Sequence, residues 1–188
     1  MSAVLAPQKN EAPLWPLSVA AYHALGQMGL IPEKTELLYG FVYHKMPKSP
    51  AHRLLFMKLL RALMAACPDG FHVQPEQPIT CADSEPEPDL SLIRGEPEDY
   101  AAGHPTTAEL VAEICMTSHD HDRSKLAAYA SAGVKEVWLV LGPERQVEVY
   151  RQPEAGRYSS RELLNADATL ASPVAPALGL KLTDLFPV

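Results

Sequence analysis

The clearest pattern of apolar residues lies in the segment that begins at Ser49. Its apolar positions recur every three or four residues, as on one face of a helix, and they are Leu54, Leu55, Leu59, Leu63 and Met64. Proline fits the first turn of a helix but cannot continue one. The segment therefore predicts a helix that starts at Pro50 and stops at Pro68.

Short apolar runs predict strands. Residues 110–115 are apolar except at Glu113, and residues 137–141 are apolar throughout, as in strands covered on both faces. Residues 146–151 alternate valine with polar residues and should pair with the run before them. Further strands are predicted at residues 71–74 and 88–93, and a hairpin at residues 35–38 and 41–46.

Two more helices complete the pattern. One is predicted from residue 17 to Gly29, and the other at residues 118–133, where Ser118 can cap the first turn. Residues beyond 151 are rich in proline and are interpreted as loop, with a short strand at 180–186. Strands that alternate with helices predict an α/β fold, here one domain over residues 16–188 behind a flexible tail at residues 1–15.

The composition is that of a globular protein, with 188 residues of which 47% are hydrophobic. The three cysteines have no CxxC spacing, which disfavours a disulfide framework or a zinc site and favours a reducing compartment. No apolar run approaches the roughly 20 residues that span a bilayer, and the first residues lack the pattern of an export signal. The expectation is a soluble, cytoplasmic protein with no membrane partner.

The charges are unevenly distributed. The net charge of −7 argues against a dedicated nucleic-acid coat protein. Residues 41–68 nevertheless contain no acid, and their basic residues are Lys45, Lys48, Arg53, Lys58 and Arg61. In residues 83–99 every charged residue is acidic except Arg94. A basic segment and an acidic one together suit a metal site next to a polyanion, with a mixed solvated surface as the alternative.

Three residues stand where chemistry is expected. Glu113 is the lone carboxylate of an apolar strand, where an unpaired charge is costly or shifts its pKa. Adjacent strands can bring Asp89 to it, and Mg²⁺ commonly takes one or two carboxylates with water and phosphate. Lys125 could then stabilise charge on a scissile phosphate. A structural salt bridge between Glu113 and Lys125 is the alternative interpretation.

A longer pattern surrounds these residues. It consists of Val111-Ala112-Glu113-Ile114-Cys115, Thr117-Ser118, Asp122-Arg123, Lys125, Tyr129, Ala132-Gly133-Val134 and Val137-Trp138-Leu139-Val140. Glu36-Leu37-Leu38 with Gly40, a helix near His52, and Pro88-Asp89-Leu90 precede it. Together these segments resemble the Uma-two family, a bacterial family abundant in cyanobacteria and assigned to endonucleases of the PD-(D/E)xK restriction-endonuclease-like superfamily.

The resemblance implies a restriction-endonuclease-like core with a central mixed β-sheet flanked by helices. It also implies a divalent cofactor, Mg²⁺ or Mn²⁺, and hydrolysis of DNA phosphodiester bonds. By this resemblance Asp89 and Glu113 match the metal-binding carboxylates, and Glu36 matches a further acid near the site.

The lysine of the superfamily usually follows the glutamate by two residues, and that position is Cys115 here. Lys125 on the following helix is the matching position in this family. Tyr129, four residues later, would share a helix face with Lys125, and so would orient the lysine or simply pack.

Other polar residues are assigned by their position in the chain. Lys48, His52 and Arg53 are expected to contact the nucleic-acid backbone, with an ordinary polar helix residue as the alternative for His52. Residues 119–122, His-Asp-His-Asp, look like a metal cluster, but a solvated first turn is favoured because successive helical residues point in different directions. Trp15 and Trp138 are interpreted as packing residues.

The sequence thus supports a Mg²⁺-dependent endonuclease acting on DNA as the first hypothesis. The alternative is a catalytically inactive protein of the same fold that binds nucleic acid or protein, since the usual Ser-Pro after the glutamate strand is Met116-Thr117 here. A homodimer is also expected, because dimers are the commonest oligomers; a homodimer with an unrelated small-molecule role is a third hypothesis.

Overall fold

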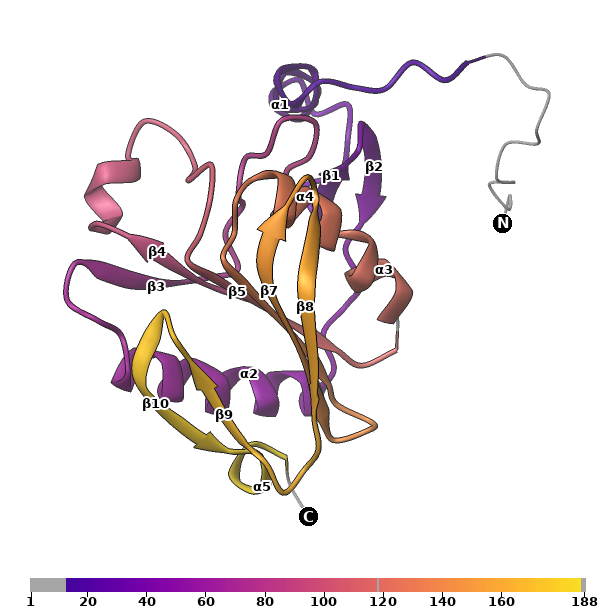
Figure 1. Ribbon diagram of the computed structural model, residues 1–188. Helices are drawn as coiled ribbons and strands as arrows, with labels where there is room; N and C mark the ends of the chain where they lie inside the picture. The colour runs from indigo at the N-terminus through magenta and orange to yellow at the C-terminus, as the bar shows by residue number, and fades with distance from the viewer. Residues whose placement is uncertain (1–12, 118, 187–188) are drawn as a thin grey trace.

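A six-stranded mixed sheet forms the centre of the molecule (Figure 1). The computed structural model describes residues 13–117 and 119–186, so the predicted tail up to residue 12 and the capping role of Ser118 lie outside the described residues. The strand order is β3-β4-β5-β6-β7-β8, and only β5 and β6 run parallel. The strands are β3 (Phe71–Pro75), β4 (Leu90–Arg94), β5 (Leu110–Cys115), β6 (Glu136–Leu141), β7 (Gln146–Glu154) and β8 (Arg157–Leu164).

Helices cover both faces of this sheet, as the resemblance implied. Alternate residues of β5 enter two separate cores, as the pleat of a strand requires: Ala112 lies in one and Val111 in the other. The first core is covered by α2 and α5, and the second by α4 (Figure 1). The helices are α1 (Val19–Gln27), α2 (Pro50–Ala65), α3 (His119–Ser124), α4 (Leu126–Ser131) and α5 (Leu182–Leu185), with a 3₁₀ turn at Pro97–Tyr100.

A separate hairpin lies beside α3 and α4. Its strands, β1 (Thr35–Leu38) and β2 (Phe41–His44), are joined by Tyr39 and Gly40, both with positive φ, as a two-residue hairpin turn requires. A side chain on Gly40 would overlap Pro16, and the Leu17 amide donates to the Gly40 carbonyl at 3.0 Å. The turn therefore needs glycine for both its φ angle and its close contact.

The structure corrects the predicted elements at several places. The helix expected at 118–133 is two helices with Lys125 at their junction. The region read as loop contains β8, β9 (Thr169–Ser172) and most of β10 (Ala175–Lys181). Of the strand expected at residues 180–186, residues 180–181 do belong to β10, whereas residues 182–185 form helix α5. These strands were missed because, apart from Leu163, their exposed residues are polar or small.

The two tryptophans differ in their surroundings. Trp138 is fully buried in the core, as predicted, whereas the side chain of Trp15 is 92% exposed, so its predicted packing role was wrong. In the described part of the chain, no helix has both the length and the apolar character that crossing a membrane requires.

Candidate active site

One cavity, of about 220 Å³, contains most of the residues singled out in the sequence. It lies where the β1–β2 hairpin, the start of α2, the end of β5 and helix α3 meet. The acidic residues that line it are Glu36, Glu87, Asp89, Glu113 and Asp122. The basic residues and histidines are His44, Lys45, Lys48, His52, His121 and Lys125.

Strand pairing brings Asp89 and Glu113 together. In the antiparallel ladder of β4 and β5, Leu90 is opposite Ala112. The same register continued by one residue places Asp89, which precedes β4, opposite Glu113. A hydrogen bond of 2.8 Å from the Ile114 amide to Asp89 Oδ2 fixes this arrangement.

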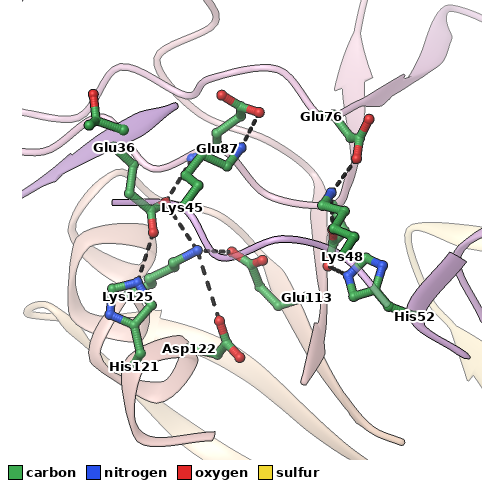
Figure 2. Close-up of polar contacts among 12 residues, drawn as sticks. Glu36, Lys45, Lys48, His52, Glu76, Glu87, Glu113, His121, Asp122 and Lys125 are labelled. Atoms are coloured by element: carbon green, nitrogen blue, oxygen red, sulfur yellow. Dashed lines mark hydrogen bonds and ion pairs between the residues drawn. The ribbon is translucent and has the colours of Figure 1, made fainter. Parts of the chain in front are cut away.

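Asp89 has basic partners on both of its oxygens. Lys48 Nζ lies 2.7 Å from Oδ1, and His52 Nε2 lies 3.1 Å from Oδ2. The same Lys48 ammonium also pairs with Glu76 (Figure 2). Burial opposes ionisation, but the hydrogen bond from His52 and the charge of Lys48 lower the pKa of Asp89 to about 2. Asp89 is therefore a carboxylate at neutral pH.

Glu113 has an asymmetric environment. It shares a strand face with Val111 and Cys115, the face that α4 covers. Its Oε1 accepts hydrogen bonds from the Tyr129 hydroxyl at 2.6 Å and from Lys125 Nζ at 3.2 Å. Among the described residues no group donates to Oε2. Burial raises the pKa of Glu113 to about 8, with the charge of Lys125 opposing that rise.

Lys125 is surrounded by carboxylates (Figure 2). Its Nζ lies 3.1 Å from Glu36 Oε2, 3.2 Å from Glu113 Oε1 and 4.0 Å from Asp122 Oδ1. Burial alone would lower the pKa of Lys125, but the negative charges of Glu113, Glu36 and Asp122 outweigh burial and raise it. The lysine is therefore held as a buried cation.

Glu36 extends the same network to helix α3. His121 Nε2 donates to Glu36 Oε1 at 2.8 Å. Burial works against ionisation, but His121 and Lys125 lower the pKa of Glu36 to about 2. Glu36 is thus the ionised partner of Lys125, whereas the pKa of Glu113 is raised.

The structure brings together most of the residues that the sequence proposed. Glu36, Asp89, Glu113 and Lys125 line the cavity with Lys48 and His52. Tyr129 and Lys125 share a helix face as predicted, because both side chains reach Glu113 Oε1. Tyr129 is also buried in the core, so it packs as well.

Arg53 is the exception among the predicted contacts. It lies outside the cavity, on a surface groove along α2. That groove is lined by Pro50, Arg53, Leu54, Met57, Lys58 and Arg61.

The structure also assigns to the site two residues of the His-Asp-His-Asp run at 119–122. His121 and Asp122 were read as part of a solvated turn, yet one bonds Glu36 and the other lies 4.0 Å from Lys125. The His-Asp-His-Asp run indicated a polar cluster, but the sequence could not predict which of its side chains face the cavity. His119 and Asp120 turn away, the former toward Glu144 at 3.5 Å.

The salt bridge between Glu113 and Lys125, the alternative interpretation, is present at 3.2 Å. It uses Oε1 alone, so the second oxygen of Glu113 is left for another partner. Within residues 13–117 and 119–186, no three His, Cys, Asp or Glu side chains are close enough to form a complete metal cage. Asp89 and Glu113 are the residues that could hold an ion with help from water and phosphate.

A family model and a solved structure both match this chain. The model of the Uma2 (Uma-two) family, described as "Putative restriction endonuclease", matches residues 22–183. A crystal structure from Anabaena variabilis ATCC 29413, described as "a putative nuclease belonging to DUF820", has the same fold, with a TM-score of 0.71 at 20% identity over 86% of this chain and 96% of that one. No curated protein matches the chain. Since the family model spans most of its length, the chain belongs to the Uma2 family.

Proposed function

We propose that this chain is a metal-dependent endonuclease that hydrolyses phosphodiester bonds of DNA. The observation that carries the proposal is the pair Asp89 and Glu113, which neighbouring strands present at one cavity together with a buried lysine. The family description and the fold of the Anabaena protein support the same reaction class.

The donor set suits a hard divalent cation. The cavity presents carboxylate oxygens, which Mg²⁺ and Mn²⁺ prefer, and no thiolate is among the described residues that line it. Glu113 Oε2 has no donor within the described residues, and Asp89 is ionised at neutral pH. These two groups would hold the ion, which when bound supplies an activated water and stabilises charge on the scissile phosphate.

The other residues have separate roles in this proposal. Lys125 is fixed by Glu36 and Glu113, so it supplies positive charge at a constant place and keeps Glu113 oriented. Lys48 is about one-third exposed at the cavity and is free to exchange Asp89 for a phosphate oxygen of the substrate. Tyr129 positions Glu113 through its 2.6 Å hydrogen bond.

The test is cleavage of plasmid and oligonucleotide DNA in Mg²⁺ or Mn²⁺, with EDTA as the blank. Wild type should cleave, and Asp89→Asn and Glu113→Gln should each lose at least about 100-fold in rate, as loss of a key electrostatic group does. Glu109→Gln is the matched control, since Glu109 is an ion-paired acid outside the cavity. Equal cleavage by Asp89→Asn and wild type would refute the proposal. DNA binding without cleavage in either metal would instead support the inactive binding protein.

A further inference from the structure

Strand β2 carries two exposed aromatic rings on the hairpin face that also carries Glu36. In its pairing with β1, Tyr43 is opposite Glu36 and Phe41 is opposite Leu38, so all four side chains share one face of the hairpin. Glu36 and Leu38 are buried, but Phe41 is 42% exposed and Tyr43 is 40% exposed. One face of the hairpin therefore carries Glu36 on β1 and exposed aromatic rings on β2.

This aromatic surface is continuous with the cavity. The ring centroids of Tyr43 and His121 are 5.2 Å apart, and His121 both lines the cavity and bonds Glu36. The chain that leaves Tyr43 continues directly into the cavity lining through His44 and Lys45. The Tyr43 hydroxyl has no hydrogen bond among the described residues, so its exposed ring is the feature this position offers.

Single exposed apolar residues are ordinary. Two rings at alternate positions of one strand form a more specific arrangement when the chain that follows them brings Lys45 and Lys48, each paired with a carboxylate, to the cavity. Nucleic-acid bases stack on such rings when they are not already stacked in a duplex, and this contact tolerates any base sequence. The net charge of −7 is poorly suited to tracking a long duplex by its backbone alone.

We propose that Phe41 and Tyr43 are a stacking platform for unpaired bases, and that the preferred substrate is single-stranded DNA whose backbone enters the cavity beside Lys48. This inference rests on the proposed function for its choice of substrate, but base stacking needs neither metal nor turnover. The bases next to the scissile phosphate would lie on β2 while the carboxylates face the phosphate itself.

Binding without metal tests the platform directly. A labelled oligothymidylate, an abasic strand of equal length and a duplex would be titrated with the full chain in EDTA at low salt, by fluorescence anisotropy. Wild type should bind the oligothymidylate more tightly than the abasic strand or the duplex. Tyr43→Leu and Phe41→Leu should each weaken oligothymidylate binding about 5- to 150-fold, the range that base stacking supplies, and leave abasic binding unchanged.

Matched variants separate stacking from folding. Tyr43→Phe keeps the ring and should bind as wild type does. Leu163→Ala removes an apolar side chain of similar exposure, 45%, from β8, and should also have no effect.

Three results would each overturn the platform. They are equal affinity for base-containing and abasic strands, higher affinity for the duplex, and an affinity of Tyr43→Leu for oligothymidylate equal to that of wild type. Base-dependent binding with no cleavage in any metal would support the platform while refuting the proposed endonuclease. Cleavage with base-independent binding would overturn the platform alone.

Discussion

Replacing Glu113 by glutamine is expected to stabilise the metal-free protein in mild alkali, even though it removes half of a salt bridge. The pKa of Glu113 is raised from 4.5 to about 8 because the carboxyl group is buried. The folded state thus holds this proton more tightly than the unfolded state does. Its contribution to stability is fully present below pH 4.5 and is lost as the pH rises toward 8.

The size of the effect follows from these two values. Each pKa unit corresponds to about 1.4 kcal/mol, so ionising Glu113 costs on the order of 2 to 5 kcal/mol by pH 8. Glutamine has the same shape and stays neutral, and its oxygen can still accept from Tyr129 and Lys125. Lys125 also keeps Glu36 as its ionised partner. Glu113→Gln should therefore exceed wild type by less than about 1 kcal/mol at pH 5 and by about 2 kcal/mol or more at pH 8.

Urea unfolding in EDTA at pH 5, 6.5 and 8 measures this difference, and titrations common to both proteins cancel in the comparison. Glu109→Gln should show the opposite sign, because the pKa of Glu109 is lowered: burial opposes that shift, but Lys135 and Arg94 outweigh burial. If Glu113→Gln were less stable than wild type at pH 8, Glu113 would be a net stabilising ion pair, and the argument from burial would be wrong.

Three further outcomes are expected. Gly40→Ala should lower the free energy of unfolding by about 2 kcal/mol or more, since φ is +78° and Pro16 fills the space, as thermal unfolding would show. Burial works against ionisation of Glu148, but Arg123 and its other partners lower its pKa from 4.5 to about 2. Glu148→Gln should therefore reduce the free energy of unfolding by about 2 kcal/mol at pH 7 and leave it nearly unchanged near pH 2, as urea unfolding would show. Lys48→Ala should reduce the salt dependence of DNA binding by about one counterion in anisotropy titrations; an unchanged slope would place Lys48 off the phosphate.

The sequence predicted the parts of the site that depend on strand order and helical period. Helix α2 has strict apolar spacing, and β5 is an apolar run with a single carboxylate, so both could be read directly. The sequence also predicted that adjacent strands could bring Asp89 to Glu113, and the register of β4 and β5 places the two residues opposite each other.

The sequence could not predict contacts that depend on angle or on surroundings. Helix α3 ends at Ser124 and α4 begins at Leu126, so the direction of His121 toward Glu36 could not be read from one continuous helical period. Arg53 follows His52 by one residue, yet it points to the outer groove because neighbouring helical positions face about 100° apart. Strand β8 lies at the sheet edge with one partner, so it lacks the apolar run that marks a covered strand.

The pairing of Lys48 with Asp89 and Glu76 makes the basic residue a resident counterion of the site. If a cation binds Asp89 Oδ1 as proposed, it competes with this ammonium, and a displaced Lys48 is then available to a phosphate oxygen nearby. Substrate that captures Lys48 would in the same way leave Asp89 vacant for the cation. By linkage each ligand then raises the affinity for the other by the same factor, so the two should bind with positive cooperativity, and the free protein should hold divalent ions only weakly until nucleic acid is present.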